Sequence, residues 1–213
     1  MQTKIHILTQ SSRLAHFVEK IQKGAKDAIK NIEEKIKLPS LDIVVADNPD
    51  TTIPETGVGG FSPNPHLVFV WINPEHKGLE NSIGEEVRRT ITHESYHAVR
   101  AATFPWNEAN LLEAFITEGL ADHFDVELNE GKPYPWSVAL SESEIEKYFD
   151  KAKNSELLSK EYDHLSWFFG SEEKDIPRWA GYAIGFKLVG DYIKKTGKTA
   201  SELVNTPAGD FIK

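Results

Sequence analysis

The stretch T-H-E-S-Y-H-A-V-R, Thr92 to Arg100, is the most informative part of the chain, because it places His93 and His97 four residues apart with Glu94 between them. Apolar residues recur at helical spacing on both sides of it, which predicts a helix over about residues 82–102. Positions four apart on a helix are separated by about 40° around the axis and about 6 Å along it. Two imidazoles on this helix can therefore converge on one metal ion.

Zinc is the ion that suits this pair. The chain has no cysteine, so any metal must be held by histidines and carboxylates. Glu94 lies about 100° from His93 and about 60° from His97 around the helix, near enough to reach a metal-bound water without binding the metal itself. Glu94 is therefore the expected general base of a metal-assisted hydrolysis. The alternative is a surface helix whose two histidines and glutamate are solvated or paired.

A third ligand is needed, because catalytic zinc usually takes three protein ligands and a water. A histidine six residues after His97 would supply one, but Thr103 stands there. Downstream, the segment L-L-E-A-F-I-T-E-G-L-A-D-H-F, residues 111–124, lies in a predicted helix over about residues 108–128. Glu118 shares the apolar stripe of that helix, and a charge buried there costs several kcal/mol unless a cation receives it. Glu118 is the predicted third ligand, and the small Gly119 and Ala121 beside it permit a close helix approach.

Other roles for these acids stay open. Glu118 could form a salt bridge with Arg100 or Arg88, and Glu113 is the rival metal ligand. Asp122, one turn after Glu118, could accept the free ring N–H of His93 and fix its tautomer, or could be a plain exposed acid.

Hydrolysis also needs a hydrogen-bond donor for the developing oxyanion, and Tyr182 is the candidate. It lies in R-W-A-G-Y-A-I-G-F, where Gly181 and Gly185 form a small face that can approach another element. A core tyrosine is the competing interpretation, because Tyr182 also falls on an apolar helical stripe. The weaker candidates are His164 and His123, the latter read as structural or surface, while Arg178 could bind a substrate carboxylate.

The remaining pattern predicts an α+β protein that is mostly helical. A small N-terminal sheet and the helix of the opening stretch form a lobe over residues 1–105, packed against a helical lobe over residues 106–213, within one catalytic domain. Strands are expected at 41–46 and 66–72, with a turn-rich segment at 47–65 between them that is either a flap or a plain loop. Further helices are expected at about 11–37, starting from Ser11 or Ser12, and at 142–153, 156–169, 177–195 and 200–204, with a loop at 129–137.

Charge and composition limit the partners. Lys and Arg number 24 against 33 for Asp and Glu, a formal charge of −9, and no basic run stands out. Nucleic acid is therefore not an expected partner, because phosphate binding requires clustered cations. The first ten residues are short and mixed, so neither a secretory signal nor a membrane span is read, and a cytoplasmic protein without a membrane partner is expected.

The chain resembles the gluzincins, zinc hydrolases in which an HExxH helix is followed by a helix bearing a glutamate ligand. H-E-S-Y-H matches the first motif, and Glu118 of E-G-L-A-D matches the second. An acid one turn after that glutamate supports a ligand histidine in thermolysin-like enzymes, which is what the resemblance implies for Asp122. Enzymes of this type bind extended peptides along an edge strand beside the active-site helix. The strand at 66–72 is the candidate for that role, and the alternative is an ordinary central strand.

A closer similarity is to a bacterial group of predicted Zn-dependent proteases of unknown function. It covers G-V-G-G-F-S-P-N-P-H-L-V-F-V-W-I-N-P at 57–74, the H-E-S-Y-H-A-V-R and E-G-L-A-D-H-F helices, and G-Y-A-I-G-F-K-L-V-G-D-Y-I-K-K-T-G at 181–197. Phe186 departs from it, since a second tyrosine is expected there. The resemblance implies a zincin fold and peptidase chemistry on peptide or protein substrates. A different class, a zinc-containing peptide-binding or chaperone-like protein without catalysis, stays open.

Overall fold

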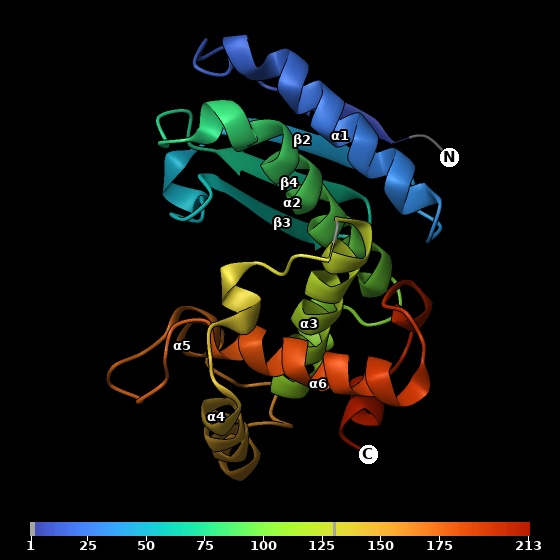
Figure 1. Ribbon diagram of the computed structural model, residues 1–213, viewed down its shortest axis with the longest axis vertical. Helices are drawn as coiled ribbons and strands as arrows, with labels where there is room; N and C mark the ends of the chain where they lie inside the picture. The colour runs from blue at the N-terminus through green and yellow to red at the C-terminus, as the bar shows by residue number, and fades with distance from the viewer. Residues whose placement is uncertain (1–2, 130) are drawn as a thin grey trace. The chain divides into compact units, whose positions relative to one another are not determined.

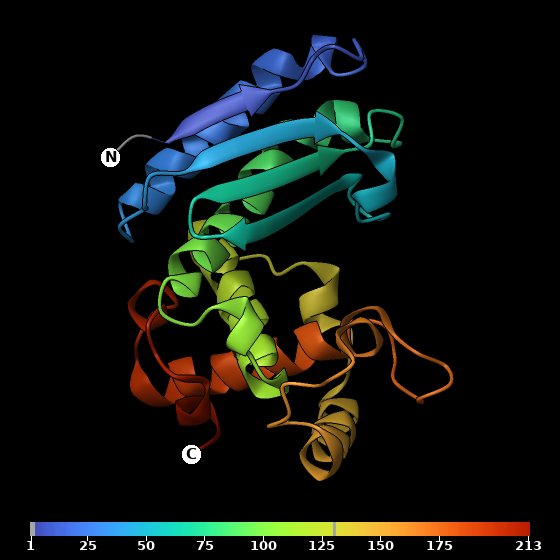
Figure 2. The same cartoon turned by 180° about the vertical axis from the view of Figure 1, so that it is seen from behind.

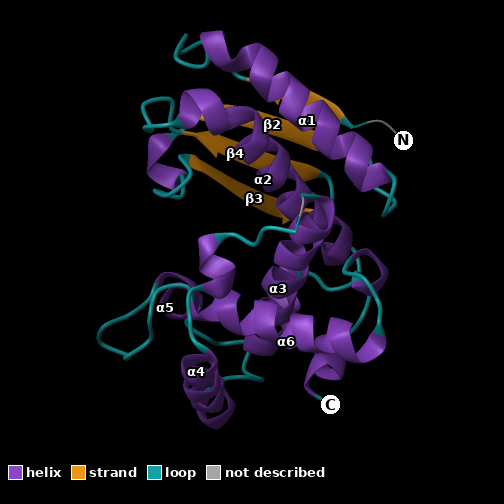
Figure 3. Ribbon diagram, in the orientation of Figure 1, coloured by secondary structure: helices purple, strands orange, loops and turns teal. Residues whose placement is uncertain are grey.

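The computed structural model describes residues 3–129 and 131–213, which form two compact units, Met1–Ala102 and Thr103–Lys213. The described chain is α+β and mostly helical, as expected, and every strand of its sheet belongs to the first unit (Figure 3). The expectations for the first two residues and for residue 130 in the 129–137 loop lie outside the described residues. Among the described helices, none is long and apolar enough to cross a membrane.

The first unit is built on a four-stranded sheet with the order β1-β2-β4-β3 (Figure 1). β1, β2 and β4 are parallel, and β3 runs antiparallel to β4 at one edge. The register of β3 on β4 shifts between Phe61 and Asn64, next to Pro63, so regular pairing is confined to the first part of β3. The strands are β1 Lys4–Ile7, β2 Asp42–Asp47, β3 Val58–Asn64 and β4 Leu67–Ile72.

Two helices of the first unit cover one face of the sheet. α1 spans Val18–Glu33 and α2 spans Leu79–Ala101, and the two pack on each other while α2 also contacts β3 and β4. In the view from behind, the opposite face of the sheet points toward the viewer, and no described helix of this unit lies in front of it (Figure 2). Val68, Val70 and Ile72 of β4 are fully buried, and the residues between them are not. Burial alternates because successive side chains of a strand point to opposite faces of the sheet.

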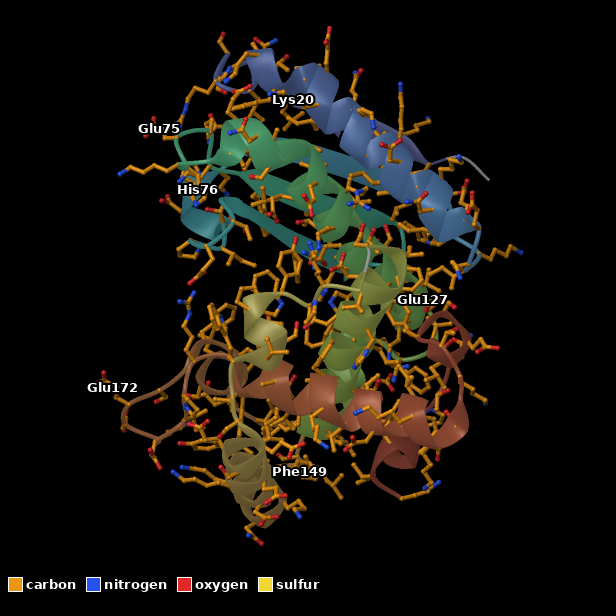
Figure 4. The ribbon with its side chains drawn as sticks, viewed as in Figure 1. Lys20, Glu75, His76, Glu127, Phe149 and Glu172 are labelled. Carbon is orange, nitrogen blue, oxygen red and sulfur yellow. The ribbon has the colours of Figure 1, made fainter. Side chains whose placement is uncertain are left out.

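The two helices approach closely at a pair of glycines. A Cβ atom at Gly24 of α1 would overlap the carbonyl oxygen of Gly84 in α2, so only glycine fits there. A polar contact adds to this crossing: Nζ of Lys20, which is labelled in Figure 4, donates to the backbone oxygen of Glu80 at 2.7 Å and also pairs with the Glu80 carboxylate. α2, which carries the His93–Glu94–His97 stretch, is thereby held against α1.

The second unit is helical. α3 and α6 pack on each other, and a Cβ at Gly185 of α6 would overlap the carbonyl oxygen of Phe115 in α3. At the C-terminal end of α3, Glu127 accepts hydrogen bonds from the backbone N and the Oγ of Ser201, at 3.1 and 2.9 Å (Figure 4). The helices are α3 Leu111–Leu128, α4 Glu142–Ser155, α5 His164–Phe169 and α6 Ala180–Thr196.

Four expectations need correction. The 47–65 segment is not a flap or plain loop throughout, because residues 58–64 form β3. As a result, the strand at 66–72 is β4, a central strand between β2 and β3, and the edge strand beside α2 is β3. The helix expected at 156–169 is reduced to α5, and the first helix begins at Val18 after a 3₁₀ turn, because Ser12 has a positive φ of 61°. β1 was not expected.

Candidate metal centre

The two histidines of α2 face one another. Their Nε2 atoms are 2.9 Å apart, and the ring planes are nearly perpendicular, at 83°. Nitrogen ligands about 2.0–2.1 Å from a tetrahedral ion lie roughly 3.3 Å apart, so a small change in side-chain torsion suffices for both to bind one ion. His97 is buried and His93 is half-buried. The helix expected over about residues 82–102 spans Leu79–Ala101, and the two rings face each other on it.

Glu94 lies against the edge strand of the sheet. Its side chain is only 7% exposed, and a Cβ placed on Gly60 of β3 would lie 2.7 Å from its Oε1 and 2.7 Å from Cγ2 of Thr90. The absence of a side chain at Gly60 therefore makes the space that the Glu94 carboxylate occupies. Sequence reasoning missed this contact, although the G-V-G-G run at 57–60 is a signal for close backbone approach.

Glu118 is buried in α3, with 7% of its surface exposed. Asn110 caps the helix by accepting the backbone N–H of Glu113 at 2.9 Å. Gly119, beside Glu118, permits a close helix approach, as expected. The helix that approaches it is α6, because a Cβ at Gly119 would overlap the backbone of Gly185. Gly185 likewise fulfils the expectation that its helix approaches another element.

Glu113, the rival ligand, has a different environment. It is half-buried, and its Oε1 accepts a hydrogen bond from Oγ1 of Thr117 at 3.1 Å. Thr117 precedes Glu118 directly, so the two acids occupy different faces of α3, because successive helical residues are about 100° apart.

Asp122 is held in place by two donors of the second unit. Oγ of Ser137 donates to its Oδ2 at 2.7 Å, and Nε1 of Trp136 donates to its Oδ1 at 3.4 Å. The side chain is 2% exposed, so the plain exposed acid is the wrong interpretation. A carboxylate that accepts these two bonds still has lone pairs for a further donor.

The tyrosine and histidine candidates differ in their surroundings. The Tyr182 ring lies 5.0 Å from the Phe168 ring and 6.4 Å from the Trp136 ring, within an aromatic cluster. His123 donates through Nε2 to the carbonyl oxygen of Phe186 at 2.8 Å and stacks on the Phe186 ring at 3.9 Å. This bond and this stack are structural, as the sequence indicated for His123. Arg178 is exposed, and its guanidinium lies 4.1 Å from the Trp179 ring.

The donor types at this centre fit zinc. Two imidazoles that already face each other, without any thiolate, are a zinc-type ligand pair, and a carboxylate is the usual third ligand of such a pair.

The fold and this helix define an α+β protein with a two-histidine candidate metal centre. Residues 21–213 match the model of the family described as "Predicted Zn-dependent protease (DUF2268)", and the chain belongs to this family. No curated protein and no solved structure matches the chain. The resemblance seen in the sequence to a group of predicted Zn-dependent proteases is thereby confirmed.

Proposed function

We propose that this protein is a zinc-dependent peptidase of the gluzincin type, in which His93, His97 and Glu118 hold the zinc ion and Glu94 is the general base. The observation that carries the proposal is the pair of Nε2 atoms 2.9 Å apart on α2, with Glu94 between them in the sequence. His93, His97 and Glu118 also form a cluster that could hold a metal ion, which supports the choice of Glu118 as third ligand. The family description agrees with zinc and with proteolysis.

When bound, zinc supplies a Lewis acid that lowers the pKa of a water molecule to about 7 and polarises the substrate carbonyl. Glu94 takes the proton from the attacking water. It then gives that proton to the nitrogen of the scissile bond, so that the C–N bond breaks and a free amine leaves. Gly60 leaves room for the Glu94 side chain beside β3, and a well-defined position of the base favours proton transfer.

Two more residues have proposed roles. Asp122 accepts the second ring N–H of His93, which fixes the tautomer that presents Nε2 to the metal. This is supported by the burial of Asp122 and by its fixed orientation on Ser137 and Trp136. Tyr182 is the proposed hydrogen-bond donor to the oxyanion.

The proposed substrate is a peptide in extended conformation, bound along β3. β3 is at the edge of the sheet, and its Gly60 touches the general base. A peptide that pairs with an edge strand is bound through main-chain hydrogen bonds, and the neighbouring pockets set the preference for its side chains. The expected location of the enzyme is the cytoplasm, which fractionation of cells would test.

The experiment combines metal analysis with cleavage of a broad peptide library. Wild type is expected to contain about one zinc per chain and to cleave members of the library. Glu94→Gln is expected to keep the zinc and lose turnover, whereas Glu118→Ala is expected to lose zinc affinity by about 10-fold or more. Glu113→Ala is the matched control, since it removes an acid from the same helix and should keep the zinc.

Two outcomes would contradict the proposal. Zinc affinity that is unchanged in Glu118→Ala but reduced in Glu113→Ala would transfer the ligand role to Glu113. A wild type that binds zinc and peptides without cleaving any of them would identify a peptide-binding module instead of an enzyme.

A further inference from the structure

The edge of the first unit's sheet that lies opposite β3 carries free backbone groups. β1 is the outer strand there, and among the described strands only β2 pairs with it (Figure 2). The amides of Lys4 and Leu8 donate to backbone oxygens on the β2 side, both at 2.9 Å. Alternate residues of a strand direct their N–H and C=O groups to opposite sides, so Ile5 and Ile7 direct theirs away from β2. Such an edge is a template for pairing with a further strand.

A groove of about 520 Å³ lies between β1 and α1, beside this free edge. Ile5 of β1 and Ile29 of α1 are its apolar lining, and both side chains are half-buried. A strand that pairs with β1 and carries a helix of its own would cover these two side chains. Their burial favours such an addition, because apolar surface is removed from water.

The same groove is lined by charged side chains of both signs. They form a lysine end, Lys26 and Lys30, and a glutamate end, Glu33 and Glu34. Spacings of three, four and seven residues place all four on one side of α1. They are exposed, and none of them forms an ion pair with another residue of the described chain. The groove is therefore neutral as a whole, with its cations and anions separated along the helix axis.

This distribution of charge is complementary to itself. Two copies related by a twofold axis use the same surface, so that surface must fit its own rotated image. When two β1 strands pair in an antiparallel manner, the two α1 helices also run antiparallel, and the lysine end of one copy meets the glutamate end of the other. Lys26 and Glu33 are separated by about 10 Å along the axis of α1. Ile29, between them, then lies near the twofold axis.

The size of the surface is sufficient for a weak, specific dimer. α1 has 16 residues, which corresponds to a length of about 24 Å. A contact along α1 and β1 buries on the order of 1,000 Å² in total, which is the lower limit of a specific interface. An interface of this size and polarity is expected to give a Kd on the order of 10–100 μM.

We propose that this protein forms a twofold dimer by antiparallel pairing of its β1 strands, with the two α1 helices side by side and each lysine end against the glutamate end of the other copy. The two four-stranded sheets then form one continuous sheet, and both of its outer strands are β3. The proposal does not depend on the peptidase function, because all of its residues belong to β1 and α1.

The test is sedimentation equilibrium of the full-length protein at about 1 to 500 μM, a range that brackets the expected Kd. The mass of wild type is expected to rise from that of the 24.0 kDa monomer to twice this value. Lys26→Glu with Lys30→Glu makes the groove wholly negative, and Glu33→Lys with Glu34→Lys makes it wholly positive. Each double variant alone is expected to remain monomeric, because like charges then face each other.

An equimolar mixture of the two double variants is the decisive sample. In it, a wholly negative groove meets a wholly positive one, so heterodimers should form about 10-fold more tightly than the wild-type dimer. The controls are Lys194→Glu with Lys195→Glu and Glu172→Lys with Glu173→Lys, which change the net charge equally at exposed positions outside the groove. Both controls should dimerise as wild type does.

Amide hydrogen exchange provides a second measurement without any substitution. The Leu8 amide is bonded within each copy, so its exchange should not depend on protein concentration. The Ile5 and Ile7 amides should exchange about 10-fold more slowly where the dimer forms. A wild type that keeps the monomer mass up to about 500 μM overturns the proposal. A dimer that neither charge reversal weakens, or a mixture of the variants that does not associate, overturns it equally.

Discussion

At the residue scale, Gly60 carries a consequence for catalysis. A methyl group there would lie 2.5 Å from Cγ of Glu94 and 2.7 Å from its Oε1, so Gly60→Ala must displace the Glu94 side chain. A displacement of about 1 Å at a reacting group costs about 100-fold in rate. We therefore expect kcat to fall by about 10- to 100-fold while zinc content is unchanged, and the free energy of unfolding to fall by about 1–3 kcal/mol.

Gly209→Ala is the control for this prediction, because a Cβ at that position meets no atom within 4 Å. Metal analysis, steady-state kinetics and urea unfolding measure the three quantities. A folded Gly60→Ala protein with wild-type kcat would show that the position of Glu94 does not limit the reaction.

The pattern of residue types predicted the α2 part of the site because both histidines and Glu94 belong to one regular helix. Spacing on a helix translates directly into direction, so the convergence of His93 and His97 follows from the sequence. The approach of Gly60 to Glu94 could not be found in this way. It depends on the packing of β3 on α2, two segments distant in the sequence, which local periodicity does not encode.

At the element scale, the crossing of α1 and α2 is asymmetric. A Cβ at Gly24 would overlap the carbonyl oxygen of Gly84, whereas the nearest atom to a Cβ at Gly84 is the Lys20 oxygen at 3.5 Å, an ordinary contact. Gly24→Ala is expected to destabilise the protein by about 1–3 kcal/mol, because backbone atoms cannot give way cheaply. Gly84→Ala is expected to be neutral or to stabilise by up to about 1 kcal/mol through helix propensity.

Urea unfolding of the two variants measures this difference, and each variant is the control of the other. Both replace a glycine in the interior of a helix of the same unit. Equal destabilisation by the two changes would mean that the helices separate at this point rather than resist the added methyl group.

The elements themselves were predicted unevenly, for physical reasons. The long helices α1, α2, α3 and α6 were recognised because each has a sustained apolar stripe. β3 was missed because its glycines and Pro63 are typical of turns, although they serve here for close packing and for a strand edge. The helix expected at 156–169 was too long, because the helix begins only after Asp163, which caps the short α5. An aspartate side chain that bonds to the following backbone favours a cap over a helix interior.

At the scale of the whole molecule, zinc binding by the proposed ligands is coupled to folding. Any ligand that binds only the folded protein stabilises it, by about 2.7 kcal/mol at a concentration of 100 times Kd. Removal of zinc by chelation and dialysis is therefore expected to lower Tm, and added zinc should restore it. The Tm of Glu118→Ala should respond much less than that of wild type to both treatments.

Differential scanning calorimetry of the zinc-free and zinc-loaded proteins checks this expectation. Glu113→Ala should respond to zinc as wild type does. A wild-type Tm that is independent of zinc would mean that the metal does not bind the folded state preferentially, which contradicts the proposed centre.

The irregular end of β3 has a consequence for self-association. Exposed sheet edges invite other chains to add strands without limit, and proteins commonly block them with proline and β-bulges. Here, Pro63 lacks an amide hydrogen, the register shifts after Phe61, and the backbone oxygen of Val58 already accepts the amide of Ile53 at 3.2 Å. A second chain can therefore form backbone hydrogen bonds with only a few residues of this edge. That is enough to bind a short segment and too little to nucleate a fibril.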